Sequence, residues 1–136
     1  MLYRRLRYYK MSDENIFVFG SNLSGRHGRG AALRAREQHG AVSGKGVGLH
    51  GTSYAIPTKD HALRGLPLDQ IAHYVDRFIE FATEHAEMSF QVTRVGCGLA
   101  GHSDKQMAPL FAGAPKNCQL PEEWKPFLPV VKGSKK

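Results

Sequence analysis

Two glycine-rich stretches carry the clearest chemical signal in this sequence. Residues 20–32 (GSNLSGRHGRGAA) and 96–102 (GCGLAGH) each follow a short apolar run and precede a segment of helical character. Glycines between a strand and a helix let backbone N–H groups approach phosphate oxygens, and a helix N-terminus attracts negative charge. Two such loops at neighbouring strand ends could hold a diphosphate from both sides. The alternative interpretation is a pair of flexible turns, the first with solvated arginines.

Three side chains near these loops could take part in a reaction. Lys59 follows the strand-like run TSYAI (52–56), where an amine could bind phosphate or attack the anomeric carbon of a sugar. Cys97 could be a nucleophile beside His102, and His102 could be a general base or contact phosphate. Each also has a structural interpretation: an exposed lysine, a small buried thiol and a loop histidine without a role.

The seven histidines lack the spacing of a metal site. They form no HxxxH or HExxH pair, and Cys97 and Cys118 form no CxxC motif. The sequence therefore predicts neither a bound metal ion nor a cofactor. No Walker A motif is present either, since GxxxxGK followed by Ser or Thr does not occur.

The composition is that of one globular domain. The chain has 136 residues, of which 41% are hydrophobic, and no run is long and apolar enough for a transmembrane helix. Two cysteines are too few for a disulfide framework. The basic first residues are followed by no apolar stretch of the kind that secretory signals contain. We therefore expect a cytoplasmic protein without membrane association.

The net charge of +7 arises from the two ends of the chain. Residues 1–10 carry +4 and residues 132–136 carry +3, whereas the basic and acidic residues of 11–131 cancel. We therefore expect a basic lead-in at 1–14, a single near-neutral domain at 15–131 and a basic tail at 132–136. Within that domain, residues 21–50 hold five basic side chains against Glu37 alone. A positive, glycine-rich stretch in a neutral domain favours a small anionic ligand over a long nucleic-acid track. Association with nucleic acid through the tails stays an alternative.

Strand-like and helix-like segments alternate along the chain. Short runs rich in β-branched and aromatic residues predict strands at 15–19, 52–56, 89–95 and 117–120, with a further edge strand in LYRRLRYY at the N-terminus. Apolar spacing and capping residues predict helices at 31–40, at 67–86 and from Ser103, with its capping-box partner Gln106, to Phe111. Residues 41–51 are expected to be a mobile loop. This order predicts an α/β fold whose ligand binds at the carboxyl ends of parallel strands.

On these residues the chain resembles the macrodomains, α/β/α modules that bind ADP-ribose. The resemblance covers residues 15–120 and rests on the blocks FGSNLSGRHGRGAAL, SYAIPTKD and VTRVGCGLAGH. It is closest to the branch of the terminal ADP-ribose protein glycohydrolases and the DNA ADP-ribosyl glycohydrolase antitoxins, and extends to short macro-like proteins of phages and bacteria. It implies a three-layer α/β/α sandwich with a mixed, centrally parallel sheet. It also implies binding of ADP-ribose or of an ADP-ribosylated macromolecule, with or without hydrolysis of the ADP-ribosyl linkage.

The resemblance further implies which residues form the site. Lys59 matches the catalytic lysine of the glycohydrolase branch, and Asn22 and His102 would position the distal ribose or a water molecule. The residues expected to contact the ligand lie in all three blocks. They are Gly20, Ser21, Asn22, His27, Gly28, Gly30, Ala31, Thr58, Gly96, Cys97, Gly98, Leu99, Ala100 and Gly101.

The sequence departs from this family pattern at two places. An aspartate follows GCGL in the glycohydrolase branch, whereas Ala100 stands there in this chain, with Asp104 four residues later. Macrodomains also begin with a strand whose aspartate recognises adenine, and the nearest equivalent here is Asp13 in MSDEN. Two alternatives to an ADP-ribosyl hydrolase therefore stay open: a nucleotide- or ADP-ribose-binding module without turnover, and a nucleic-acid-associated or assembly protein that acts through its basic tails.

Overall fold

The computed structural model describes residues 15–129. The predicted lead-in with its edge strand, Asp13 and the tail 132–136 lie outside the described residues. The strands are β1 (Asn15–Asn22), β2 (Gly48–His50), β3 (Ser53–Lys59), β4 (Ser89–Val92) and β5 (Cys118–Gln119). The helices are α2 (Gly30–Gln38), α3 (Leu68–Glu84) and α4 (Asp104–Met107), with two 3₁₀ helices, η1 (Ala108–Phe111) and η2 (Glu122–Phe127).

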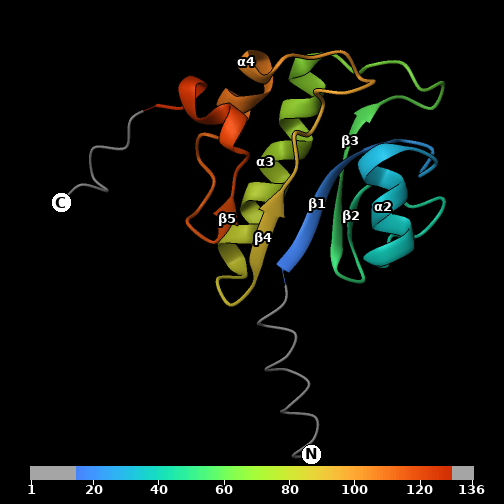
Figure 1. Cartoon of the computed structure of the whole chain (residues 1–136), viewed down its shortest axis with the longest axis horizontal. Coiled ribbons are helices and arrows are strands. Elements are labelled where there is room, and N and C mark those ends of the chain that lie inside the picture. The colour runs from blue at the N-terminus through green and yellow to red at the C-terminus, as the bar shows by residue number, and fades with distance from the viewer. Residues whose placement is uncertain (1–14, 130–136) are drawn as a thin grey trace, which may run out of the picture.

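The five strands form one mixed sheet in the order β2-β3-β1-β4-β5 (Figure 1). The central strand β1 pairs in parallel with β3 and with β4, and β4 pairs in parallel with β5. Only β2, at one edge, runs antiparallel to its neighbour β3. This arrangement confirms the predicted α/β class with a mixed, centrally parallel sheet.

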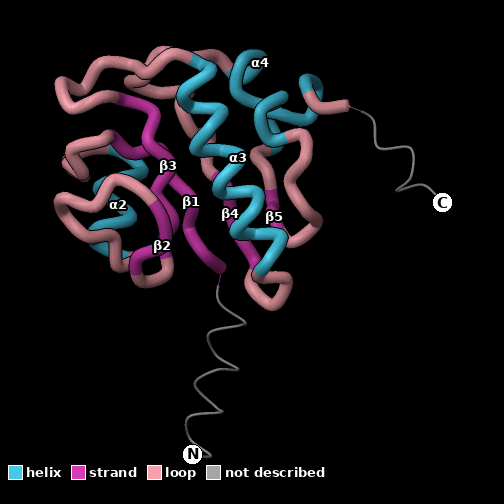
Figure 2. The backbone as a smooth tube through the Cα atoms, turned by 180° about the vertical axis from the view of Figure 1, so that it is seen from behind, coloured by secondary structure: helices cyan, strands magenta, loops and turns pink. Residues whose placement is uncertain are grey.

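Helices cover both faces of the sheet, with α2 on one face and α3 on the other (Figures 1 and 2). Successive residues of β1 point to opposite faces, as a strand requires. Phe17 and Phe19 pack with Ala35 of α2, while Ile16 and Val18 belong to the larger core that includes the buried stripe of α3. Because each face of the sheet is apolar and covered, the fold has three layers.

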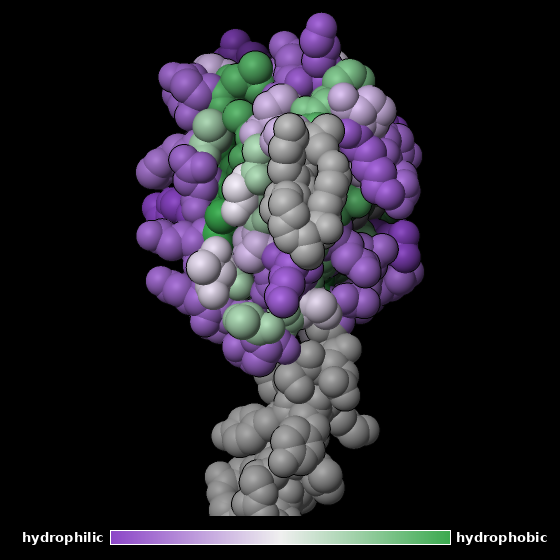
Figure 3. All heavy atoms as spheres, turned by 90° about the vertical axis from the view of Figure 1, so that its left-hand side faces the viewer, coloured by the Kyte–Doolittle hydropathy of each residue, from purple (hydrophilic) through white to green (hydrophobic). Residues whose placement is uncertain are grey.

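The apolar core is also buried on the side of the molecule where β5 lies. Hydrophilic side chains dominate this face and surround a narrow apolar band (Figure 3). Trp124 of η2 and Phe111 of η1 are fully buried, with ring centroids 4.9 Å apart. Within residues 15–129, no helix combines the length and the apolar character needed to span a bilayer.

The glycine-rich residues 41–51 differ from expectation, because they are fixed against the first loop and contain β2. A Cβ atom on Gly46 would lie 2.0 Å from the carbonyl oxygen of Asn22, and one on Gly25 would lie 2.3 Å from the carbonyl carbon of Gly44. The two backbones can touch only where side chains are missing. These glycines therefore allow residues 41–51 to pack closely against the first loop.

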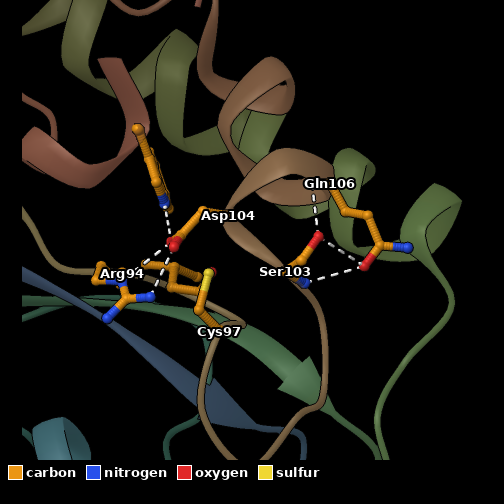
Figure 4. Close-up of polar contacts among 7 residues, drawn as sticks. Arg94, Cys97, Ser103, Asp104 and Gln106 are labelled. Carbon is orange, nitrogen blue, oxygen red and sulfur yellow. Dashed lines mark hydrogen bonds and ion pairs between the residues drawn. The ribbon is translucent and has the colours of Figure 1, made fainter. Parts of the chain in front are cut away.

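The boundaries of several elements also differ from expectation. Strands β1 and β3 continue to Asn22 and Lys59, so both reach further into the predicted loops, whereas β4 ends at Val92. The helix after Ser103 is short and continues as 3₁₀ turns through Phe111. The predicted capping box is present, since the Ser103 hydroxyl accepts from the Gln106 backbone N–H and the Gln106 side chain accepts from the Ser103 N–H (Figure 4).

Candidate ligand-binding site

A cleft of about 720 Å³ lies at the carboxyl ends of β1, β3 and β4. Its volume falls within the range of about 300–1,000 Å³ that is usual for small-molecule sites. Both glycine-rich loops and the end of β3 contribute to its walls. The lining residues are Gly20, Asn22, Arg26, Gly28, Arg29, Gly30, Ala31, Ala32, Thr58, Lys59, Leu63, Thr93, Arg94, Val95, Gly96, Gly98, Leu99 and Ala100.

The topology of the sheet explains why these segments meet. Strand β1 lies between β3 and β4 and is parallel to both, so the loops after all three strands leave the same edge. Asn22 is paired with Lys59 across β1 and β3, next to a register irregularity after Ser21. On the other side, Thr93 directs its backbone N–H and its hydroxyl to the carbonyl of Val18, at 3.0 and 2.8 Å. The ends of the three strands are thus held together by hydrogen bonds.

Asn22 shapes the first loop from inside. Its side-chain Nδ2 donates to the carbonyl of Arg26 at 2.8 Å, and its Oδ1 accepts from the Arg26 N–H at 2.9 Å and from the Ser24 hydroxyl at 2.8 Å. Only 4% of the residue is exposed. At most one amide hydrogen of Asn22 remains free to meet a ligand, and its main effect is to fix the turn that carries Arg26.

Ser21 and His27 were expected to contact a ligand, but neither lines the cleft. The Ser21 hydroxyl donates to the carbonyl of Gly46. His27 is 2% exposed, and its Nε2 lies 3.1 Å from the carbonyl of Val42 and 3.2 Å from that of Lys45. Because carbonyl oxygens only accept, these contacts place the ring proton on Nε2. Both side chains hold residues 41–47 in place through hydrogen bonds to backbone carbonyls. Backbone partners leave no pattern in the sequence, so the burial of this serine and histidine could not be predicted.

The second loop presents backbone rather than side chains to the cleft. Gly98 has no atom within 4 Å of where a Cβ would stand, so a ligand can approach its peptide closely. Gly96 has a φ of +79°, and a Cβ there would meet the Met107 sulfur at 2.8 Å. Glycine is therefore required at Gly96 by both conformation and packing.

Cys97, Gly101 and His102 do not line the cleft. Burial, followed by the neighbouring Asp104, raises the pKa of the Cys97 thiol to about 11, so the thiol is protonated near neutral pH and is a poor nucleophile. The Nε2 atom of His102 lies 2.9 Å from the carbonyl of Leu66, to which it donates. His102 thus makes a structural hydrogen bond, and its role beside the ligand stays a prediction.

The side chains that do line the cleft make it strongly positive. Its walls include Arg26, Arg29, Lys59 and Arg94 and no aspartate or glutamate. Within residues 15–129, the ion pairs of the chain involve only one of these cations, Arg94. Cations in a concave site concentrate the electrostatic potential there, which favours a ligand with several negative charges.

Sequence analysis did not identify Arg94. This side chain is held by Asp104, which is in turn held by Trp124. Its Nε and Nη2 atoms donate to the two carboxylate oxygens of Asp104, at 3.0 and 2.6 Å (Figure 4). Trp124 Nε1 also donates to Asp104, at 2.8 Å. The Arg94 guanidinium holds the pKa of the Asp104 carboxyl at about 2. The Asp104 carboxylate therefore bonds to Arg94 and Trp124, and it does not take the place of the aspartate that the glycohydrolase branch has at the position of Ala100.

The rim of the cleft carries two exposed leucines, Leu99, which was expected to contact the ligand, and Leu63, which sequence analysis did not identify. Leu99 is 68% exposed and Leu63 is 40% exposed. Leu63 has a φ of 66°, an uncommon backbone conformation for a residue with a branched side chain, in a turn whose N–H groups at Ala62 and Arg64 donate to the Asp60 carboxylate. Such turns carry no sequence signal beyond the aspartate itself.

Comparison with known proteins supports the fold. No family model matches the chain, and no match was found among the curated proteins. Among solved structures, DarTG of Thermosipho africanus, in complex with ADP-ribose, is similar, with a TM-score of 0.57 over 92% of this chain. The two sequences are 18% identical, and this chain spans 42% of the length of the DarTG chain. The likeness shows a macrodomain-like fold, as the resemblance in sequence implied.

Proposed function

We propose that the cleft binds ADP-ribose, free or attached to a macromolecule, with the diphosphate between the two glycine-rich loops. The observation that carries the proposal is that both loops line one cleft together with four cations and no carboxylate. The similar fold of DarTG, whose structure contains ADP-ribose, supports the same ligand class.

The start of α2 offers an anion-binding element to this site. The first N–H groups of a helix have no partner within the helix and attract anions. Here the residue before the helix, Arg29, provides no side-chain cap, and the first turn contains no acidic residue. Gly28 and Gly30 both leave open space where a Cβ would stand. A phosphate can therefore approach the free N–H groups without meeting a side chain.

Hydrolysis of an ADP-ribosyl linkage is a second candidate function, and the position of Lys59 favours it. The amine belongs to a residue that lines the cleft, and its pairing with Asn22 across the sheet sets where the side chain begins. In this version, the Lys59 amine attacks the anomeric carbon of the distal ribose as the bond from that carbon to the attached group breaks and the departing group takes up the amine proton. Water then releases ADP-ribose from the lysine. The lack of a carboxylate among the lining residues favours binding without turnover.

Gly28 offers a direct test of ligand binding. In the variant Gly28→Glu, the protein can fold because the new side chain meets no neighbouring atom, but this side chain brings bulk and negative charge to the cleft. Gly113→Glu is the matched control, since Gly113 is equally open and lies outside the cleft. Titration calorimetry with ADP-ribose should give heat for the wild type and for Gly113→Glu and none for Gly28→Glu. No heat from the wild type at millimolar ligand, or equal binding by both variants, would refute the proposal.

The basic tails suggest a separate role in nucleic-acid association, which stays a prediction. Removal of residues 1–10 and 132–136 should weaken any DNA binding and flatten its dependence on salt. DNA binding that survives this deletion with the same salt dependence would exclude the tails as its cause. The cytoplasmic location likewise stays a prediction.

A further inference from the structure

A second hollow of about 230 Å³ adjoins the cleft. Its walls are Ala31, Thr93, Arg94, Cys97 and Gly98, and all of these except Cys97 also line the cleft. A ligand whose diphosphate lies between the two glycine-rich loops can therefore extend into this side hollow. The walls are small or uncharged, apart from Arg94.

Arg94 differs from the other cations of the site in how firmly its plane is held. The bidentate contact with Asp104 uses one edge of the guanidinium, the edge that carries Nε and Nη2. Asp104 is itself held by Trp124, a fully buried residue of η2. The side chain of Arg94 nevertheless stays 49% exposed. The guanidinium plane is thus fixed by the edge that binds Asp104, and the rest of the group is partly exposed.

The charge of Arg94 is also less available to a phosphate than that of its neighbours. Asp104 compensates the guanidinium at 2.6 Å, whereas Arg26, Arg29 and Lys59 take part in no ion pair within residues 15–129. A guanidinium whose plane is held in place is well suited to stack on a flat ring. Stacking on aromatic or guanidinium surfaces is a general way in which proteins hold nucleobases.

We propose that Arg94 is a stacking platform for the planar base of the ligand and that the side hollow receives this base. The inference rests on the proposed function, since it assigns to the adenine of ADP-ribose a place beside the second loop. It makes Arg94 a residue that favours ligands with a base over base-free phosphates.

Charge and planarity can be separated with two substitutions and three ligands. Arg94→Ala removes both properties, while Arg94→Lys keeps the charge and removes the plane. Each protein is titrated with ADP-ribose, AMP and pyrophosphate, and thermal unfolding is recorded to confirm that each variant is folded. Stacking predicts that both variants lose about tenfold in affinity for ADP-ribose and AMP, and that pyrophosphate binding is unchanged.

The outcomes distinguish this inference from the proposed function. Wild-type affinity of Arg94→Lys for ADP-ribose, or an equal loss of pyrophosphate binding in Arg94→Ala, would show a charge contact and overturn the stacking role alone. Binding of AMP that depends on Arg94, without binding of ADP-ribose to the wild type, would refute the proposed function and leave the platform standing. If the wild type binds neither adenine ligand, both are refuted.

Discussion

Asn22 and Lys59 are paired across β1 and β3, at the last residue of each strand. The backbone continues this contact, since the Leu23 N–H donates to the Lys59 carbonyl at 2.9 Å. One residue folds the first glycine-rich loop and the other brings an amine to the cleft. Their relative position is set by the parallel pairing of two buried strands, so it does not depend on the loops themselves.

Lys59→Ala separates catalysis from binding. If the amine acts on the anomeric carbon, release of ADP-ribose from a modified protein or oligonucleotide should fall by about a hundredfold or more. Affinity for free ADP-ribose should fall only severalfold, since three other cations line the cleft. Lys116→Ala, an exposed lysine outside the cleft, is the control. Release by Lys59→Ala at the wild-type rate would exclude this role.

Trp124→Phe tests whether the buried indole positions Arg94 through Asp104. The substitution keeps an aromatic ring in the core but removes the N–H that donates to Asp104 at 2.8 Å. We expect a loss of stability of about 1–3 kcal/mol and a weaker affinity for ADP-ribose. In an Arg94→Ala background, Trp124→Phe should cause no further loss of affinity, although it should still lower the melting temperature. An equal loss in both backgrounds would show that Trp124 acts independently of Arg94.

Asp104 should make the fold sensitive to acid. The Arg94 guanidinium lowers the pKa of the Asp104 carboxyl from 3.8 to about 2 in the folded chain. A lowered folded-state pKa gives stability that is complete above the unfolded value and is lost as the pH falls through the folded value. Between about pH 4 and pH 2, the melting temperature of the wild type should therefore fall more steeply than that of Asp104→Asn.

Asp60 remains in both proteins of this comparison. Its pKa is also lowered, chiefly by the backbone hydrogen bond from Arg64, so it contributes acid sensitivity to each. The difference between the two melting curves therefore isolates Asp104. Parallel curves over this pH range would contradict the role of the Arg94–Asp104 contact in stability.

Cys97 should react slowly with alkylating reagents. Burial, with Asp104 as a further cause, raises the pKa of its thiol from 9.0 to about 11. In a Cys118→Ser background, alkylation by iodoacetamide at mildly alkaline pH should be roughly a hundredfold slower than that of a small free thiol. Cys97→Ala should retain any turnover, because a protonated thiol is a poor nucleophile. Rapid alkylation, or loss of turnover in a folded Cys97→Ala protein, would restore the thiol as a nucleophile.

The fold was largely predictable because its signals are local. The apolar runs of β1, β3 and β4 and the apolar stripe of α3 are continuous in sequence, and they give the element order. The order in turn places the two glycine-rich loops at one edge of a parallel sheet. The sequence alone does not show why each glycine is needed. Gly46 and Gly25 allow two backbones to touch, whereas Gly28 and Gly98 leave space for a ligand.

The contacts that sequence analysis missed join residues that are far apart in the chain. Arg94 meets Asp104, and Asp104 meets Trp124, only because α4 and η2 fold back over the end of β4. The position of His27 could not be predicted for a similar reason. Its partners are the backbone carbonyls of Val42 and Lys45, and every residue has such a carbonyl. Long-range side-chain partners of this kind depend on packing and not on a local pattern.

Two segments that line the cleft, the turn that holds Leu63 and the second glycine-rich loop, come into close contact where Gly65 meets Ala100. A Cβ atom on Gly65 would lie 2.4 Å from the carbonyl oxygen of Ala100, so any larger residue would push the turn that holds Leu63 away from the second loop. Sequence drift at this position must therefore be accompanied by rearrangement of residues 96–101. A larger residue at this position is therefore expected to change the width of the cleft, which both Leu63 and Ala100 line.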